Sequence, residues 1–557
     1  MYRKILLLIA LILQFTTTVY AQPSAVKNVQ KAVFAFISYD KNGNEIGSGN
    51  GVFVSNDGEA VAPCKPFFGA YRVEVTDHAG KKYEVKRMLG ANEVHNLAHF
   101  KIEAKTTAAT VVGAAALQQG TKLYCVGTKQ NGNIKQGAVK SVETFMDKYS
   151  YSIIKLVGQE GLGGCPFVTE QGQVAGLLEI SPNTADAYST DIRYALTLMP
   201  QVLSATDPAL AKINVPQQLP SALEDARVMA MMITTRDSLK YAAAATDFME
   251  AFPAEMDGYT MAANVATNAG DCEAADDIMK KAMKNVTDKA EVNYEFSKLI
   301  YNKLTYQPEP AYAPWTYDKA IEYIRAAEEI SNLSLYRNYE VQILFVQQKY
   351  AEADQILITL LAEKDVNKPQ IYYESARCKQ AMGVANEELV ALLDSAINNV
   401  DSLSINSAAP YFLMRGQLKD EMKNYREAVL DYSRYQLVSQ NKVDDAFFYT
   451  RFKAEVNARL YQQAIVDIQN CIIVNPQEPL YPAEKAQLEL RVGMIDEAIV
   501  SANYCVKIAP DNHTGYTLLA IAQARKGEKE AAMKNFEKAK ELGETRTEEY
   551  VKKYVGN

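Results

Sequence analysis

Two kinds of hydrophobic pattern divide the sequence. From residue 25 to residue 205, short runs of alternating or continuous apolar residues are separated by turn formers, as in KNGNE and NDGE. Many short runs of this kind predict strands in a β-barrel or sandwich. After a proline-containing stretch over 206–222, which we expect to be a linker, the apolar positions take a helical period over 223–557. The pattern therefore predicts an all-β domain followed by an all-α region.

The helical region contains an internal repeat. Ala464, Ala498 and Ala532 lie 34 residues apart, as do Cys471 and Cys505. Small side chains let two antiparallel helices approach closely, and a generic helical bundle would not hold one spacing over three consecutive units. MIDEAIVSANYCVKIAPDN and its copies resemble the second helix of the tetratricopeptide (TPR) repeat. The resemblance implies a TPR solenoid of about eight or nine repeats.

The first residues have the composition of a signal peptide. Arg3 and Lys4 precede an apolar run from Ile5 to Phe15, and small residues follow it. This run is shorter than the ~20 apolar residues that span a bilayer. We therefore expect 1–21 to be a cleaved signal peptide and the mature protein to be exported without a membrane span. The absence of a sorting signal favours the periplasm over full secretion.

Composition excludes several classes of function. The net charge is −8, and no run of basic residues is present, so we expect no binding to nucleic acid. The seven cysteines show no CxxC spacing, and only four histidines occur in the chain. These residues predict neither a metal site nor a disulfide scaffold, and nothing in the sequence calls for a cofactor.

Three segments of the first half carry a family resemblance. In chain order they are GSGNGVFVSNDGEAVAPCKPF, YEVKRMLGANEVHNLAHFKI and EGLGGCPFVTEQGQVAGLL. They resemble, respectively, the segments that carry the histidine, the aspartate and the nucleophilic serine of trypsin-fold proteases of the HtrA type. The resemblance covers nearly all of residues 30–205. It implies a trypsin-like domain of two β-barrels over 25–205.

The same resemblance predicts that the catalytic triad is lost. The family's histidine falls on Lys65, its aspartate on Asn96 and its serine on Gly163. Acyl transfer needs a nucleophile, a base of near-neutral pKa and a carboxylate that orients this base. Gly163 has no side-chain atom that could attack a carbonyl. We therefore expect no catalytic residues at these positions and a pseudoprotease domain.

Two alternative sets of side chains could still support proteolysis. Cys165 could act as a displaced nucleophile, although it lies two residues beyond the serine position. His95 and His99 lie near Asn96, but neighbouring residues of a strand point to opposite faces, and a structural role is the more common one. We expect none of these three side chains to restore proteolysis.

Cys64 and Cys165 adjoin the positions where the family's histidine and serine meet. An exported compartment permits a disulfide between them, which would close the inactive site. The alternative is two buried thiols that act as small apolar residues. Cys471 and Cys505 occupy the small-residue positions of the repeat and need no chemistry.

The repeats also predict a surface for a polypeptide partner, because the first helices of stacked units line the concave face of a solenoid. The register gives six candidates for this face: Tyr449, Lys453, Asn457, Gln487, Arg491 and Arg525. Arg491 and Arg525 are one repeat apart and could together hold a carboxylate or an acidic segment. The alternative for each residue is a solvated helix face.

These features favour one function over two others. We expect an exported adaptor or assembly factor that binds polypeptides through its repeats and carries an inactive trypsin-like domain. The alternatives are an active peptidase with an unrecognised nucleophile and a structural subunit of an envelope complex. The sequence contains no direct sign of self-association.

Overall fold

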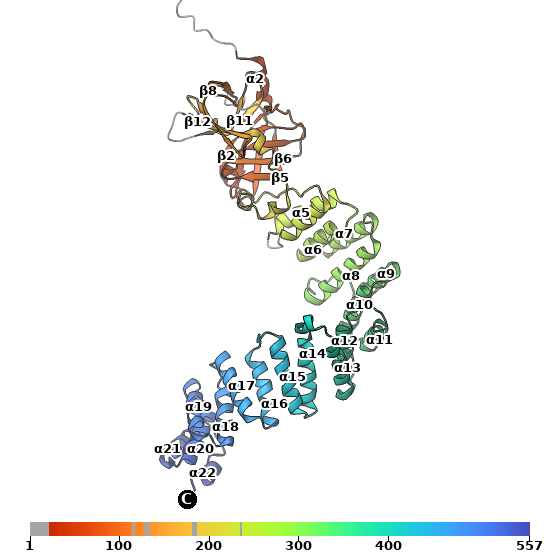
Figure 1. Cartoon of the computed structure of the whole chain (residues 1–557), viewed down its shortest axis with the longest axis vertical. Helices are drawn as coiled ribbons and strands as arrows, with labels where there is room; N and C mark the ends of the chain where they lie inside the picture. Colours follow the sequence, from red (N-terminus) through yellow and green to blue (C-terminus); the bar gives the residue numbers. More distant parts are fainter. Residues whose placement is uncertain (1–21, 114–116, 129–133, 181–185, 234–236, 557) are drawn as a thin grey trace, which may run out of the picture. The chain divides into compact units, whose positions relative to one another are not determined.

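The computed structural model describes residues 22–113, 117–128, 134–180, 186–233 and 237–556, so the predicted signal peptide lies outside the described residues. The chain divides into two compact units, residues 1–315 and 316–557 (Figure 1). Among the described residues, the first contains two β-barrels and five longer helices, and the second is all α-helical. The predicted fold class, a trypsin-like double barrel followed by an all-α solenoid, is confirmed.

The first barrel consists of six antiparallel strands that close in the order β1-β2-β3-β6-β5-β4. Alternate side chains of β1, among them Phe34 and Phe36, are buried in the barrel core, as the period of two predicts. The strands are β1 Val33–Tyr39, β2 Glu45–Phe53, β3 Glu59–Ala62, β4 Arg72–Thr76, β5 Lys82–Asn92 and β6 Leu97–Ile102.

The second barrel repeats this topology with the order β7-β8-β9-β12-β11-β10, again closed and antiparallel. Closure pairs every strand on both sides, so neither barrel leaves an open sheet edge. Its strands are β7 Lys122–Cys125, β8 Lys135–Phe145, β9 Tyr149–Lys155, β10 Pro166–Val168, β11 Val174–Ile180 and β12 Asp186–Asp191.

Short helices surround the barrels. Helix α2 (Ser24–Val29) and the 3₁₀ helix η2 (Gln30–Ala32) precede β1, η3 (Lys65–Phe67) follows β3, and α3 (Ile192–Ala195) follows β12. Asp191 caps α3 by accepting a hydrogen bond from the Arg193 backbone N–H.

The predicted linker packs against the first barrel. The 3₁₀ helix η4 (Val202–Thr206) leads into it, and η5 (Leu210–Lys212) lies within it. Leu210, Ile213 and Val215 are buried in the core of this barrel, and the Met88 backbone N–H donates to the Pro216 carbonyl. Apolar burial therefore holds residues 209–217 against the barrel wall.

Five helices complete the first unit: α4 Leu223–Met232, α5 Ser238–Ala251, α6 Asp257–Asn268, α7 Cys272–Asn285 and α8 Lys289–Tyr306. Arg87 of β5 joins the barrel to this group, because its guanidinium donates to both carboxylate oxygens of Asp247 on α5 at 2.6–3.0 Å. Both side chains are largely buried, which places α5 firmly beside the first barrel.

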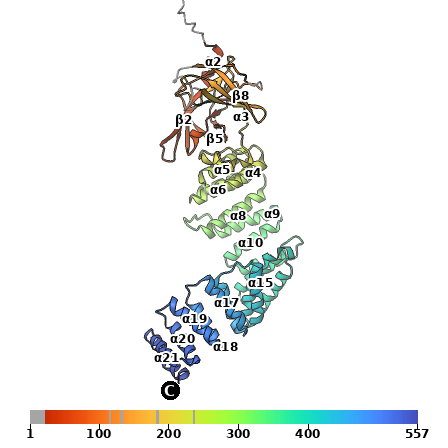
Figure 2. The same ribbon diagram turned by 60° about the vertical axis from the view of Figure 1, so that its left-hand side comes forward.

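The second unit is a succession of antiparallel helices in which each packs on the next (Figures 1 and 2). Ala428, Ala464, Ala498 and Ala532 are fully buried at the crossings, as the repeat predicts. The helices are α9 Tyr317–Ile330, α10 Ser334–Val346, α11 Tyr350–Leu360, α12 Lys368–Ala381, α13 Asn386–Asn398, α14 Ala409–Glu421, α15 Tyr425–Val438, α16 Asp445–Asn457, α17 Tyr461–Val474, α18 Leu480–Val492, α19 Ile495–Ile508, α20 His513–Lys526, α21 Lys529–Glu541 and α22 Thr547–Tyr554, with η6 (Ser402–Ala408) before α14.

A left-handed residue ends the first helix of each successive pair. In the second unit these residues have φ between 59° and 95° and lie at equivalent turns: Gln348, Gly383, Lys423, Arg459, Gly493 and Gly527. The tight turn requires this conformation, which glycine adopts without strain. Among the helices in the described part of the chain, none is both long enough and apolar enough to cross a bilayer.

Candidate functional site

The positions expected to carry a catalytic triad converge where the two barrels meet. Lys65 begins η3, directly after β3, and Asn96 lies in the turn between β5 and β6. The Lys65 backbone N–H donates to Asn96 Oδ1 at 3.0 Å. The turn that contains Gly163 reaches the same place, since a Cβ on Gly164 would lie 2.8 Å from Pro63 Cδ. The fold thus brings the three predicted segments together.

The turn before β10 is held by Asn50 of β2. The Asn50 side-chain amide donates to the carbonyls of Gly161 and Gly163 at 3.1 and 2.9 Å, and its backbone N–H donates to Gly163 at 3.1 Å. Gly164 has a φ of +82°, and a Cβ there would lie 2.1 Å from the Asn50 carbonyl oxygen. Only glycine fits this close approach, so the contact with Asn50 fixes the backbone shape of the turn.

The space beside Gly163 is bordered by hydrocarbon. Within 4 Å of the point where a Gly163 Cβ would lie, the only described atoms beyond the neighbouring residues are two carbons of Ile180, the nearer at 3.3 Å. Lys65, at the histidine position, directs its ammonium to Glu179 of β11, with Nζ 3.8 Å from Oε1. The junction therefore contains an exposed cation, a carboxylate and an aliphatic side chain.

Cys165 is turned away from this junction. It is fully buried in the core of the second barrel, where it contacts Cys125. A hydrogen bond to the Cys125 thiol and burial hold the pKa of Cys165 well above its ordinary value. A nucleophilic cysteine needs the opposite, a thiolate stabilised by positive charge.

The two cysteines of the hypothesised disulfide are both free thiols in different cores. Cys64 belongs to the first barrel, and its Sγ donates to the Asn92 carbonyl at 3.3 Å. Burial raises the pKa of Cys64 to about 12. Each thiol behaves as a small apolar core residue.

Both nearby histidines have packing partners within the barrel domain. His95 stacks on Phe145 with ring centroids 4.3 Å apart and meets Tyr194 edge-on. His99 is buried, with Nδ1 3.2 Å from the Leu198 carbonyl and Nε2 3.5 Å from Glu59. Burial lowers the pKa of both imidazoles. Both act within the barrel packing.

Four of the six residues predicted on the concave face have intramolecular partners of different kinds. Lys453 lies over the ring of Tyr449 at 5.0 Å, and Tyr449 packs against Tyr481. Arg491 lies over the ring of Tyr461 at 5.1 Å, whereas Arg525 donates to the Leu490 carbonyl. The two arginines are therefore engaged by separate groups.

The other two predicted residues, Asn457 and Gln487, are exposed. Asn457 lines an open cavity of about 480 Å³ at the helix turns, together with Lys423, Arg426 and Arg459. This cavity is shallow and follows the tips of the helix pairs.

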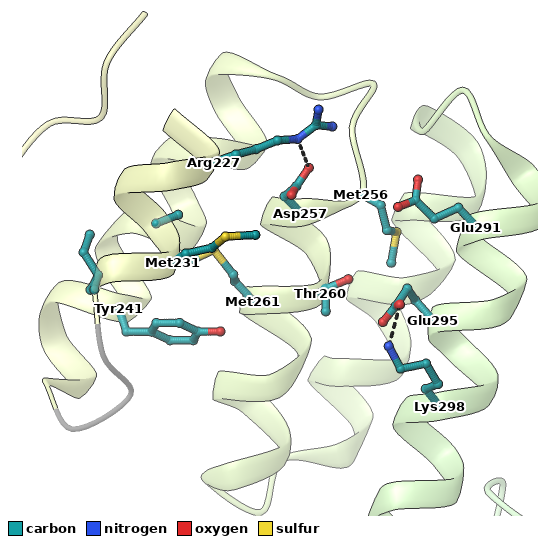
Figure 3. A pocket seen from close by; sticks show the side chains of 12 residues that line it. Arg227, Met231, Tyr241, Met256, Asp257, Thr260, Met261, Glu291, Glu295 and Lys298 are labelled. Carbon is teal, nitrogen blue, oxygen red and sulfur yellow. Dashed lines mark hydrogen bonds and ion pairs between the residues drawn. The ribbon is translucent and has the colours of Figure 1, made fainter. Parts of the chain in front are cut away.

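A larger groove lies in the first unit, between α4, α6 and α8 (Figure 3). Its volume is about 570 Å³, and twelve residues line it: Arg227, Ala230, Met231, Ile233, Tyr241, Met256, Asp257, Thr260, Met261, Glu291, Glu295 and Lys298. Reasoning from the sequence missed this groove, because the strongest repeats are near the C-terminus. The sequence does place charged residues together here. Glu291, Glu295 and Lys298 are spaced by four and three residues, which puts them on one face of a helix.

The described residues contain no group of three His, Cys, Asp or Glu side chains placed to hold a metal ion. No protein-family model matches the chain, and no curated protein is significantly similar to it. The likeness to trypsin-like proteins therefore concerns the architecture: two six-stranded antiparallel barrels joined to a helical region.

Proposed function

We propose that this protein is an exported polypeptide-binding adaptor or assembly factor. In this proposal the barrels form an inactive relative of HtrA-type proteases, and the helix pairs are TPR-like repeats that bind the partner. The helical region offers what a polypeptide ligand requires, an open groove with apolar and charged walls.

The observation that carries the proposal is the composition of the junction around Gly163. The turn keeps its glycine-dependent shape, but Ile180 carbons occupy the place next to the missing side chain. Lys65 is paired with Glu179, and Cys165 is buried with a raised pKa. These features supply neither a nucleophile nor a base for acyl transfer. Binding is the activity that remains for this architecture.

Two assays on the full chain without its first 21 residues test the proposal. The first incubates the protein with a fluorogenic peptide library, and we expect no hydrolysis above the rate without protein. The Gly163→Ser/Lys65→His/Asn96→Asp variant shows whether the turn accepts a triad. Wild-type turnover that disappears in Cys165→Ala would overturn the inactive barrel and favour a cysteine peptidase.

The second assay measures binding of unfolded polypeptides by fluorescence anisotropy. We expect saturable binding by the full chain. The same affinity after the groove residue Met231 is changed to serine would contradict a role of the helical groove. Binding that needs a single stoichiometric protein neighbour and no free polypeptide would favour a structural subunit instead.

A further inference from the structure

The groove between α4, α6 and α8 continues along α8. A second cavity of about 130 Å³ adjoins it and shares Thr260, Glu295 and Lys298. Asn302, one turn beyond Lys298 on α8, lines this second cavity. One face of α8 thus forms a continuous wall of polar side chains over three turns. An extended peptide can contact such a wall with every second side chain.

The opposite side of the groove is rich in methionine. Met231 of α4 is 82% exposed, and Met261 of α6 and the buried Met256 line the same space (Figure 3). Methionine adapts its shape to different apolar partners, which suits a site that accepts varied side chains.

The two cations of the groove are already neutralised. Arg227 makes ion pairs with Glu224, Glu255 and Asp257 at 2.9, 2.7 and 3.1 Å. Lys298 pairs with Glu295 at 2.7 Å, as Figure 3 shows. An acidic ligand could pair with Arg227 or Lys298 only by displacing one of these carboxylates. Breaking the existing ion pair would reduce the affinity for such a ligand.

Glu291 is a solvent-exposed carboxylate at the groove. It makes no ion pair with any residue that the structure describes. Burial of part of the side chain raises the pKa of Glu291, the carboxylates of Asp288, Asp257 and Glu295 raise it further, and Arg227 lowers it. Three carboxylates, those of Asp257, Glu291 and Glu295, line the groove together with two cations. The groove therefore has an excess of negative charge that a cation would relieve.

We infer that this groove binds an extended polypeptide segment in which a lysine or arginine pairs with Glu291 and a neighbouring apolar side chain packs on Met231 and Met261. The inference rests on the proposed polypeptide-binding function and names the class of segment. This basic segment is opposite in charge to the acidic segment that Arg491 and Arg525 of the last repeats suggested.

The test uses three short fluorescein-labelled peptides and the full chain without its first 21 residues. The three peptides have leucine and serine at the same positions. At all remaining positions, one peptide has lysine, the second has glutamine and the third has glutamate. We expect the lysine peptide to bind about tenfold more tightly than the glutamine peptide, as one charge-assisted pair allows, and the glutamate peptide to bind most weakly. The lysine advantage should fall as salt is added.

Two variants localise the effect. Glu291→Gln should remove the tenfold advantage of the lysine peptide and leave the glutamine peptide unchanged. Met231→Ser should weaken the lysine and glutamine peptides by the same factor. Glu273→Gln is the matched control, because Glu273 is an exposed carboxylate in the first turn of the neighbouring helix α7 and does not line the groove. Circular dichroism confirms that each variant keeps its helix content.

The outcomes separate this inference from the function on which it rests. If all three peptides bind equally well, or if Glu291→Gln keeps the lysine advantage, the inference is wrong and polypeptide binding stands. Preference for the glutamate peptide overturns it in favour of an acidic segment. If none of the peptides binds, both the inference and the proposed function fail.

Discussion

Glu455 makes the stability of the second unit depend on pH. It lies on α16, is 3% exposed, and its Oε2 has no hydrogen-bond partner among the described residues. Arg451, one turn earlier, makes two hydrogen bonds to Asp467 of α17 at 2.6 and 2.9 Å, whereas its Nε is 3.9 Å from Glu455. The Arg451 guanidinium is thus hydrogen-bonded to Asp467 and not to Glu455. Burial and the nearby Asp467 carboxylate raise the pKa of Glu455 to about 8.

The sign and size of the effect follow from proton binding. An unfolded glutamate releases its proton near pH 4.5, whereas folded Glu455 keeps it up to about pH 8. Between these values the native state binds more protons, so the free energy of unfolding falls as pH rises. The slope is about 1.4 kcal/mol per pH unit. At pH 7 the loss is about 3 kcal/mol, which is a large share of the stability of a typical domain.

Glu455→Gln removes this titration and keeps the size of the side chain. We expect wild type and variant to unfold at similar temperatures at pH 4.5, and the variant to gain roughly 6–12 °C over wild type at pH 7, given about 2–4 °C per kcal/mol for a unit of this size. Thermal unfolding followed by circular dichroism at several pH values gives this difference. Glu530→Gln, an exposed carboxylate on α21, should show none. A gap that is constant or shrinks from pH 4.5 to 8 would refute the reasoning.

Three further substitutions test other parts of the structure. Lys423→Gly relieves a non-glycine residue at a φ of 63° and should raise the free energy of unfolding by about 1 kcal/mol, as measured by thermal unfolding. Arg87→Ala removes the bidentate contact to Asp247, and we expect a loss of about 2 kcal/mol and faster limited proteolysis between the barrel and α5; unchanged cleavage would contradict this. Arg415→Leu leaves Asp431 buried and should cost about 3 kcal/mol in chemical denaturation, whereas the double Arg415→Leu/Asp431→Leu variant should recover most of it.

The fold could be predicted because its periodicities are local. Alternation in β1 buries Phe34 and Phe36, and the 34-residue spacing places Ala464 and Ala498 at helix crossings, where both are fully buried. The packing of residues 209–217 could not be predicted in this way. Prolines are common both in free linkers and in segments that lie flat on a barrel. The two cases are distinguished only by the burial of Ile213 in the core of the first barrel, which the structure shows.

The sequence contains a pattern from which the buried ion pairs of the second unit could have been predicted. Arg415 and Asp431 lie 16 residues apart, and Arg451 and Asp467 repeat this pair 36 residues later. A recurring arginine and aspartate at a fixed separation predict that two helices present them to each other. Their burial follows from the crossing of the helices and cannot be seen in composition.

At the junction of the barrels, the sequence predicted which segments meet but not what fills the space between them. The convergence of Lys65 and Asn96 with the Gly163 turn follows from the order of the segments. Ile180 lies at the end of β11, and its position over Gly163 depends on the register of that strand with its neighbours. Register is set by the whole barrel, so no local pattern reveals this contact.

The two sets of charged residues in the helical region show when a repeated charge points to a ligand. Arg525 is near the C-terminal end of α20, where a cation has ready partners in unsatisfied carbonyls, and it donates to that of Leu490. Arg491 likewise finds the ring of Tyr461. Glu291 is near a helix N-terminus, where a carboxylate is favoured, yet burial and the surrounding carboxylates still raise its pKa. A carboxylate without a direct ion pair, in a groove whose lining carries more carboxylates than cations, is open to a cationic side chain of a ligand, and this favours the groove at α8 over the arginines of the last repeats.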